Sequence, residues 1–290
     1  MNDKLPSLPY IGVDIGGSHI TAAHISAADF KIVKGTLVRA RVASMEGAEV
    51  IIKAWVDALA PLIISSGDQA IHIGVAMPGP FDYEKGISLM KGTKKYDSLY
   101  GMNVLEILAE KLGIPQDHIL FRNDAESFLH GELASGAVAG EKRALGITLG
   151  TGLGSASNCK GKTVDSDRAF LPFKDSIAEE YISTRWFSKR YLELTGKEVK
   201  NVESLLASAD KVIIDQIFDE FGQNLAQFLN VFIAEETPDV VVIGGNIAKT
   251  WDHFIPIVLK HLENKNVILK QSTMWEDAAL VGAAYSWKLS

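Results

Sequence analysis

Short apolar runs that stop at glycines or at turns alternate along the chain with segments whose apolar residues recur every three or four positions. The first run, 11–15, ends at a glycine pair, and the patterns over 21–25 and 31–33 predict two more strands of an antiparallel meander. A dinucleotide-binding fold would instead place a helix directly after the first glycines. The meander therefore disfavours that fold.

Helical periodicity is clearest over 48–65 and over 215–235, where the apolar residues form one broad stripe that we expect in the core. Asn103 is placed to cap a helix that Gly113 ends. Further strands are expected over 70–76 and 118–121, and further helices over 104–111, 124–133 and 176–194.

Three apolar strands, within 11–18, 145–155 and 240–247, end in glycines. Glycine lacks a Cβ and readily adopts positive φ, so such turns let the backbone approach phosphate. Two of these turns facing each other across a cleft could hold opposite sides of a triphosphate, with the third near the adenosine. This arrangement predicts an α/β protein with the actin-like ATPase (ribonuclease H-like) fold, in which a nucleotide cleft separates two lobes.

The length of 290 residues, with 47% apolar side chains, supports two lobes. We expect a small N-terminal lobe of residues 1–122, joined by the C-terminal helix 276–290, and a large lobe of residues 123–275. The hinge is expected at Asn123-Asp124, where a strand delivers two polar residues to a helix start.

Charge and composition exclude several classes of function. Acidic residues outnumber basic ones by 36 to 29, and no stretch gathers enough Lys and Arg to follow a nucleic acid. Residues 1–10 lack an apolar signal core, and no window approaches the roughly 20 apolar residues of a membrane span. We therefore expect a cytoplasmic protein that binds neither nucleic acid nor membrane, and we expect a homodimer. The single Cys159 rules out an internal disulfide and a cysteine-rich zinc site.

Asp14 lies two residues before Gly16, so strand alternation places its carboxylate at the mouth of the strand, where it could hold Mg²⁺ or its waters. The alternative is a strand-end acid bonded to local amides. Ser18 and His19 follow the glycines and could donate to phosphate oxygens, although His19 could equally be an ordinary strand residue.

Asp124 is the candidate base, because a carboxylate at a helix start in the cleft could take a proton from an attacking hydroxyl. From spacing alone, a helix cap is the better explanation, since Asp and Asn cap helices routinely. The turn around Gly79 is rigid and could form a wall for a polyhydroxy ligand, or be only a turn. The histidines form no metal-binding pair, and no Gly-x-Ser-x-Gly elbow indicates a hydrolase.

Several strings, in this order along nearly the whole chain, resemble the ROK family of sugar kinases and sugar-responsive repressors. Residues 11–18, IGVDIGGS, are similar to the family's first phosphate motif, and Ser18-His19 stand where Thr-Lys is common in the family. The other matching strings are GVAMPGP at 74–80, NDAE at 123–126, LGTGLG at 149–154, VIGGN at 242–246 and DAALVGAA at 277–284.

The resemblance implies ATP as cofactor with Mg²⁺, and Asp124 as general base for a sugar hydroxyl. It implies that Asn123, Glu179 and the Gly79 turn contact the sugar. The residues it assigns to the nucleotide are Asp14, which also binds Mg²⁺, and Gly16, Gly17, Ser18, His19, Gly150, Thr151, Gly152, Gly154, Gly244, Gly245 and Asn246.

The chain departs from the family in its zinc segment. It lacks the cysteines and the histidine of that segment, for which Asp165 to Arg168 is the nearest match, so we expect no zinc site. Packing by Leu171, Pro172 and Phe173 is expected to brace the Glu179 segment instead.

The function implied is transfer of the γ-phosphoryl group of ATP to a hexose hydroxyl, most simply the 6-hydroxyl, as in a glucokinase. The alternatives are an N-acetyl amino-sugar kinase and a non-catalytic sugar-sensing relative of the family's repressors. Few residues precede the first phosphate strand, which disfavours an added DNA-binding helix-turn-helix.

Overall fold

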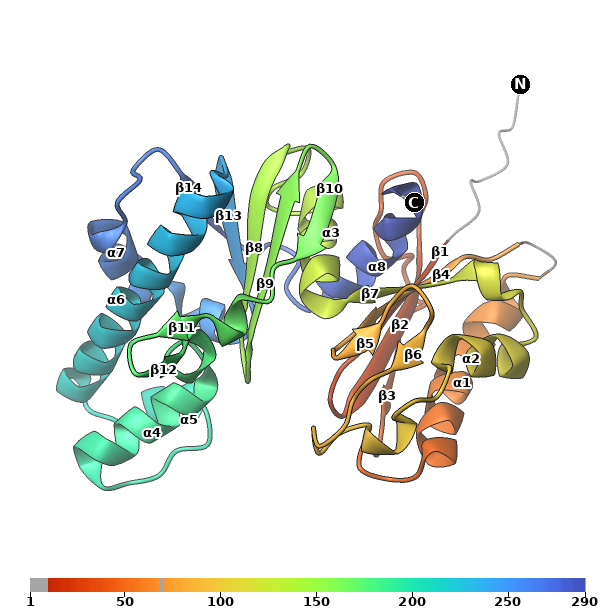
Figure 1. The fold of residues 1–290 in the computed structure, drawn as a ribbon, viewed down its shortest axis with the longest axis horizontal. Helices are drawn as coiled ribbons and strands as arrows, with labels where there is room; N and C mark the ends of the chain where they lie inside the picture. The colour runs from red at the N-terminus through yellow and green to blue at the C-terminus, as the bar shows by residue number, and fades with distance from the viewer. Residues whose placement is uncertain (1–9, 68–69, 290) are drawn as a thin grey trace. The chain divides into compact units, whose positions relative to one another are not determined.

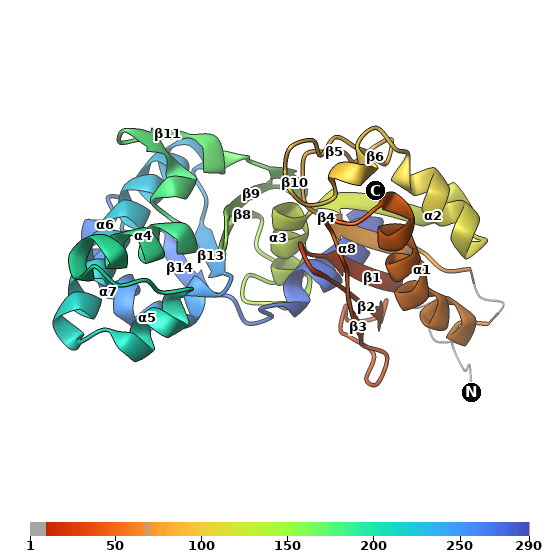
Figure 2. The ribbon, with the colours of Figure 1, turned by 90° about the horizontal axis from the view of Figure 1, so that it is seen from below.

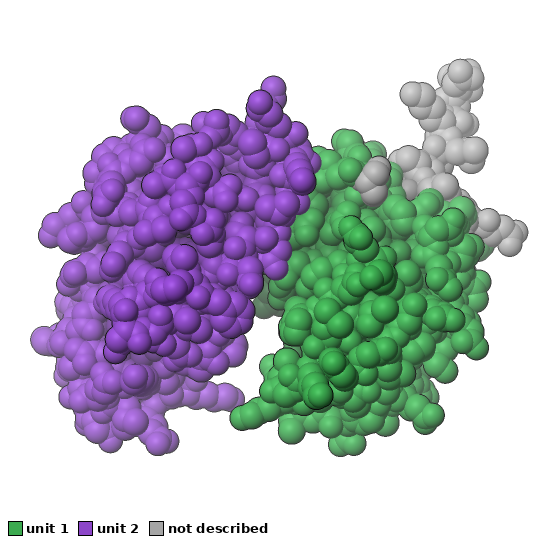
Figure 3. All heavy atoms as spheres, in the orientation of Figure 1, with its two compact units in different colours: residues 1–139, 276–290 green, residues 140–275 purple. Residues whose placement is uncertain are grey.

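The computed structural model describes residues 10–67 and 70–289, so residues 1–9 of the segment expected to lack a signal core lie outside the described residues. Contacts within the chain divide it into two compact units, one up to residue 139 and again from 276, the other from 140 to 275 (Figure 3). This division moves the expected boundary from residue 122 to residue 139. The physical reason is the helix that begins at Asp124, which packs against the C-terminal helix within unit 1.

Unit 1 is built on a five-stranded sheet of order β3-β2-β1-β4-β7 (Figure 1). The first three strands form the predicted meander, and β4 and β7 are added parallel to β1. The elements of the sheet are β1 (Tyr10–Ile15), β2 (His19–Ile25), β3 (Val38–Arg41), β4 (Ile73–Met77) and β7 (Ile119–Asn123). The remaining elements are α1 (Ala48–Ser65), α2 (Val104–Leu112), α3 (Asp124–Ser135), α8 (Asp277–Leu289) and the hairpin β5 (Phe81–Asp82) to β6 (Ile87–Ser88).

The third strand of the meander was predicted over 31–33 but lies over Val38–Arg41. Of the run 31–33, only Ile32 forms an isolated bridge, to Ile25. Phe30 adopts φ 51° and Gly35 φ 84°, so the chain turns twice before it pairs with β2 over Val38–Arg41. The helix over 48–65 and the helix that begins after Asn103 and ends at Gly113 are confirmed.

Helices cover the two faces of this sheet (Figure 2). Ile11 and Val13 of β1 pack with Ile51 and Trp55 of α1 on one face. On the other face, a Cβ at Gly12 would lie 2.2 Å from the carbonyl oxygen of Leu280 in α8. Strand alternation therefore places Asp14, two residues after Gly12, on the face that α8 covers.

Unit 2 repeats the strand order and directions of unit 1 in its sheet β10-β9-β8-β13-β14. The strands are β8 (Arg143–Leu149), β9 (Leu153–Cys159), β10 (Lys162–Asp165), β13 (Val240–Gly244) and β14 (Ile268–Gln271). The other elements are the hairpin β11 (Pro172–Phe173) to β12 (Ser176–Ile177), and helices α4 (Thr184–Thr195), α5 (Val202–Ser208), α6 (Lys211–Glu236) and α7 (Trp251–His261).

The long helix of unit 2 starts earlier than its apolar pattern indicates. The Asp210 carboxylate accepts a hydrogen bond from the Ile213 N–H, 3.0 Å, and caps α6 ahead of the apolar stripe. All eight residues of that stripe are at most 2% exposed: Ile217, Phe218, Phe221, Leu225, Phe228, Leu229, Phe232 and Ile233.

The helix expected over 176–194 is wrong in its first part. Residues 176–183 form β12 and a single 3-10 turn, and α4 begins only at Thr184. The backbone of this segment is engaged by β11 and by the Leu171 carbonyl, which accepts from Ala178 N–H, so it is not free to form helical bonds. In the described part of the chain, no helix combines the length and hydropathy needed to cross a bilayer.

Candidate active site

The carboxyl ends of β1, β4 and β7 lie next to one another at one edge of the unit 1 sheet. Asp14 pairs with Ala76, and Met77 pairs with Asn123, in parallel register. Asp124 follows directly after β7. Residues 14 and 124 thus meet at one edge of one unit, although the sequence pattern predicts them in different lobes.

The charge of Asp124 acts on Asp14. Burial first, and then the charge of Asp124, raise the pKa of Asp14 to about 7 against the lowering effect of Arg39. The Asp14 carboxylate is a donor that fits Mg²⁺, because carboxylate oxygens are the preferred ligands of this ion and a divalent cation would relieve the repulsion between Asp14 and Asp124.

Asn123, not Asp124, caps helix α3. Its side-chain oxygen accepts hydrogen bonds from the N–H groups of Ala125, 2.7 Å, and Glu126, 3.2 Å. Asp124 is the first residue of the helix, and its Oδ1 accepts from Ala125 N–H at 2.9 Å. The capping explanation for Asp124 therefore applies to its neighbour.

The environment of Asp124 favours the protonated form. Solvent reaches this carboxylate, yet the surrounding protein removes enough water to raise its pKa, against the lowering effect of the Ala125 N–H. A carboxylate with a raised pKa binds a proton more strongly, which suits a general base.

Tyr83, which is not among the residues predicted from the sequence, connects the remaining sugar-side residues. Its hydroxyl donates to the Met77 carbonyl, 3.0 Å, and accepts from Asn123 Nδ2, 3.2 Å. A Cβ at Gly79 would lie 3.3 Å from the same oxygen. The Gly79 turn, Tyr83 and Asn123 therefore form one polar group beside Asp124. No periodicity or spacing signal marks Tyr83.

The first glycine turn has its carbonyl groups bonded to the protein. The Gly16 carbonyl accepts a hydrogen bond from the Tyr96 hydroxyl (2.6 Å), and the Gly17 carbonyl accepts one from the Ser44 hydroxyl (2.6 Å). The Ser18 carbonyl accepts one from the Val42 N–H (2.8 Å). Within residues 10–67 and 70–289, the N–H groups of Gly17 and Ser18 have no acceptor. Two adjacent backbone donors are thus left for an anion.

Ser18 and His19 complete this turn. Their side chains bond each other, with Ser18 Oγ 2.9 Å from His19 Nδ1. The expected positive φ is wrong for Gly16 and Gly17, which do not adopt it. A Cβ at Gly17 would lie 2.3 Å from Nζ of the flexible Lys95 side chain, so the turn and this ammonium group are close neighbours.

The second glycine turn, in unit 2, carries Glu179 against it. Glu179 Oε2 accepts from Leu153 N–H at 3.0 Å, and a Cβ at Gly152 would lie 2.6 Å from that oxygen. The Thr184 N–H and hydroxyl both bond the Gly150 carbonyl, at 2.8 and 2.9 Å. Thr151 is exposed, and Gly154 lies in β9.

The third glycine turn lies beside the second, because β13 and β8 are parallel neighbours with Gly244 opposite Thr148. Gly245 is the one predicted glycine of these turns with positive φ, 85°. A Cβ there would lie 2.4 Å from the Leu149 carbonyl oxygen. Asn246 follows and is exposed.

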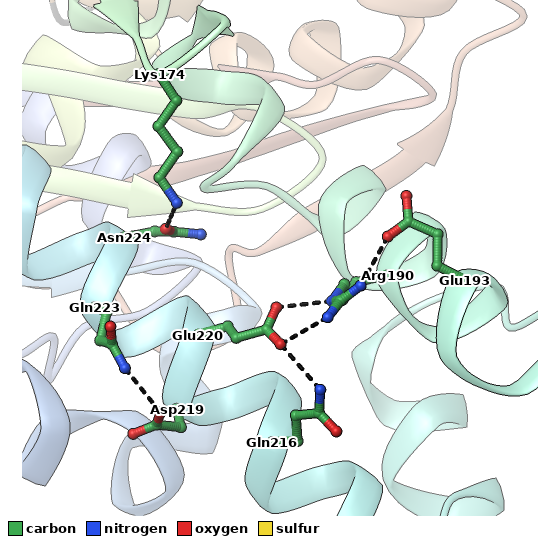
Figure 4. Close-up of polar contacts among 8 residues, drawn as sticks. All are labelled: Lys174, Arg190, Glu193, Gln216, Asp219, Glu220, Gln223 and Asn224. Atoms are coloured by element: carbon green, nitrogen blue, oxygen red, sulfur yellow. Dashed lines mark hydrogen bonds and ion pairs between the residues drawn. The ribbon is translucent and has the colours of Figure 1, made fainter.

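Both polar and apolar contacts hold the segment that carries Glu179. Lys174 Nζ donates to the buried Asn224 Oδ1 of α6 at 2.5 Å, as Figure 4 shows, and lies 5.0 Å above the Tyr181 ring. Of the three residues expected to brace it, Phe173 is buried against Tyr181 and Leu171 is packed on the core, but Pro172 is exposed. In the described residues, no three His, Cys, Asp or Glu side chains are grouped as a metal site needs.

A cavity of about 1050 Å³ in unit 2 is a separate feature, lined by α6, α4 and the Lys174 segment. None of the predicted site residues lines it. Three of its charged side chains pair with one another: Arg190 with Glu220 (2.7 Å) and with Glu193 (3.0 Å), as Figure 4 shows. The residues predicted to carry the chemistry lie elsewhere.

The candidate residues thus form two groups, one in each unit. Unit 1 carries the two carboxylates, the Gly79 turn and the first glycine turn, and unit 2 carries Glu179 with the second and third glycine turns. A family model for the ROK family matches residues 10–165, more than half of the chain. The protein belongs to the ROK family.

Several curated relatives of this ROK protein are sugar kinases. It is 24% identical to the glucokinase of Thermotoga maritima over 333 aligned positions that cover 97% of each chain. It is 27% identical to the N-acetyl-D-glucosamine kinase of Photobacterium profundum over 205 positions, covering 61% of this chain and 65% of that one.

The fold of this ROK protein is that of solved ROK structures. The ROK family glucokinase of Streptomyces griseus, crystallised with glucose and AMPPNP, matches with a TM-score of 0.73 at 22% identity and covers 95% of this chain and 98% of its own. The ROK hexokinase of Thermus thermophilus matches with a TM-score of 0.76 at 21% identity, over 96% and 97% of the two chains. The predicted actin-like ATPase fold is confirmed.

Proposed function

We propose that this protein transfers the γ-phosphoryl group of ATP to a hexose hydroxyl, most simply the 6-hydroxyl of glucose, with Asp124 as the general base. The family and the named relatives identify an ATP-dependent sugar kinase. The observation that supports the base is the position of Asp124: it stands at the sheet edge beside Asp14, with the neighbouring Asn123 taking over the helix cap.

In this mechanism the Asp124 carboxylate accepts a hydrogen bond from the sugar hydroxyl and takes its proton as the oxygen attacks the γ-phosphorus. Asn123 and the Gly79 turn orient neighbouring hydroxyls, and Glu179 contacts the sugar. The free N–H groups of Gly17 and Ser18 bind phosphate oxygens, and the second and third glycine turns contact the nucleotide. Asp14 would hold Mg²⁺ directly or through water, and the ion would supply neutralisation of the phosphate charge.

The experiment is an ADP-release assay over a panel of hexoses and N-acetylhexosamines, with wild type and Asp124→Asn. The amide preserves shape but cannot take a proton, so we expect kcat to fall by about 100-fold or more, while sugar binding measured by calorimetry is retained. Glu110→Gln, at an exposed position of α2, is the matched control and keeps full turnover. Equal turnover in Asp124→Asn would remove the base assignment.

The same panel of sugars distinguishes a hexose kinase from the second candidate, an N-acetyl amino-sugar kinase. The similarity to the Photobacterium profundum enzyme supports this second candidate. In that case kcat/KM is highest for an N-acetylhexosamine. The cytoplasmic location and the homodimer expected from the sequence stay predictions, which cell fractionation and light scattering test.

A further inference from the structure

The first glycine turn has a cation beside it that comes from a different part of the chain. His19 occupies the position where the family commonly has lysine. The ammonium group of Lys95 lies at Gly17 instead, so close that a Cβ at Gly17 would be 2.3 Å from Nζ. Lys95 is 78 positions further along the chain than Gly17 (95 − 17 = 78).

The segment that carries Lys95 is bonded directly to the turn. The Tyr96 side chain is 1% exposed, and its hydroxyl donates to the Gly16 carbonyl at 2.6 Å. The Tyr96 N–H donates to the Ser44 carbonyl at 2.6 Å, and the Ser44 hydroxyl donates to the Gly17 carbonyl at 2.6 Å. The residue after Lys95 is therefore fixed to both glycines of the turn.

The loop before Tyr96 is also an ordered element. The Asp97 carboxylate accepts from the N–H groups of Gly92, 3.2 Å, and Thr93, 2.9 Å. Lys94 and Tyr96 adopt φ values of 65° and 61°, a left-handed conformation that is costly for such residues. The contacts of this loop hold Lys95 between two strained residues.

The charge of Lys95 is not neutralised by the protein. In the described residues, no carboxylate forms an ion pair with Lys95, whereas Arg39, the cation that acts on Asp14, pairs with Glu276 at 2.9 Å. The Lys95 side chain is exposed. An unpaired ammonium beside two N–H groups without acceptors is an arrangement for binding a multiply charged anion.

We propose that Lys95 binds an oxygen of the phosphoryl donor's phosphate chain while that chain lies on the N–H groups of Gly17 and Ser18. Lys95 thereby supplies the cation that position 19 lacks and is a specificity-determining residue for a polyphosphate-bearing donor. This inference rests on the proposed function for the identity of the donor, but the binding of the anion can be measured without any sugar.

The test compares Lys95→Gln with Lys94→Gln, which removes the same charge one residue away. Calorimetry of each protein with inorganic tripolyphosphate, without sugar, gives the first readout. We expect Lys95→Gln to weaken binding about tenfold and Lys94→Gln to leave it within about twofold, because only Lys95 reaches the turn. In steady state, Lys95→Gln raises KM for ATP by a similar factor and leaves KM for the sugar unchanged.

Equal weakening by both variants would overturn the proposal, since it would show a general charge effect. Unchanged tripolyphosphate binding in a folded Lys95→Gln protein would also overturn it. If Lys95→Gln does not fold, Lys95→Arg, which keeps the charge, must restore both folding and tripolyphosphate binding, and failure to restore binding in the folded protein counts against the proposal. A wild type that phosphorylates no sugar but binds tripolyphosphate through Lys95 contradicts the proposed function and supports this inference.

Discussion

Glu179 and Leu153 are joined by a hydrogen bond in which the carboxylate Oε2 accepts the backbone N–H at 3.0 Å. One oxygen of a residue expected to touch the sugar thus fixes the turn expected to hold phosphate. The other oxygen lies 2.5 Å from Arg185 Nη2. Both oxygens of Glu179 are therefore held before any substrate binds.

Glu179→Ala should affect both substrates. It removes the sugar contact and leaves the Leu153 N–H without its acceptor, so we expect KM for the sugar to rise about tenfold or more and KM for ATP to rise by a smaller factor. Glu180→Ala, at the neighbouring position that also contacts Arg185 (3.3 Å), is the control and leaves both constants near wild type. A change in both variants alike would point to Arg185 instead.

Asp14→Asn should stabilise the protein, and more so at high pH. The folded pKa of Asp14, about 7, lies above the ordinary value of 3.8, so ionisation of Asp14 lowers the free energy of unfolding as pH rises through this window. The advantage of the variant over wild type should grow by about 2.6 kcal/mol between pH 5 and pH 8. Urea unfolding at the two pH values measures it, and a difference that does not vary with pH would contradict the raised pKa.

Protonation of His130 should destabilise the protein in acid. Burial in α3 lowers the pKa of His130 to about 4, and its Nδ1 lies 2.9 Å from Ser286 Oγ of α8. The unfolded chain takes up the proton near pH 6.5 and the folded one only near pH 4, so the free energy of unfolding falls by about 3 kcal/mol as pH drops through that interval. His130→Asn should remove most of this fall in urea titrations. A variant as acid-sensitive as wild type would exclude His130 as its source.

Gly282→Ala should destabilise unit 1 strongly. A Cβ at this position of α8 would lie 1.7 Å from the Ser127 carbonyl oxygen and 2.5 Å from the Gly131 nitrogen, both backbone atoms of α3. The helices must move apart, and we expect a loss of about 3 kcal/mol or more in the free energy of unfolding. Gly47→Ala, where a Cβ meets nothing within 4 Å, is the matched control and should cost below about 1 kcal/mol. Equal Tm values for the two variants would contradict the close packing.

The parts of the fold predicted from the sequence are those set by local physics. Helix α1 has the predicted bounds because its apolar period is regular, and α2 does because Asn103 and Gly113 mark its ends. Helix α4 was predicted too early because pairing of β11 with β12, which is not local, withdraws its first residues from helix formation. Within the site, the glycines and carboxylates could be found from motif order.

The residues that were missed act across long sequence separations. Tyr96 contacts Gly16, and Lys95 contacts Gly17, from a loop that has no periodicity and no motif. Tyr83 reaches Asn123 across 40 positions. Such contacts follow from the three-dimensional path of the chain, which no pattern within a single segment encodes.

Helix α8 also affects how the protein is made. In unit 1, α8 (residues 277–289) covers the face of the sheet at Gly12 and Gly74. The ribosome synthesises all of unit 2 before it synthesises this helix. During translation that face of the unit 1 sheet therefore stays uncovered, although all strands of the unit 2 sheet have already been synthesised. The order of folding is thus expected to run opposite to the order of synthesis.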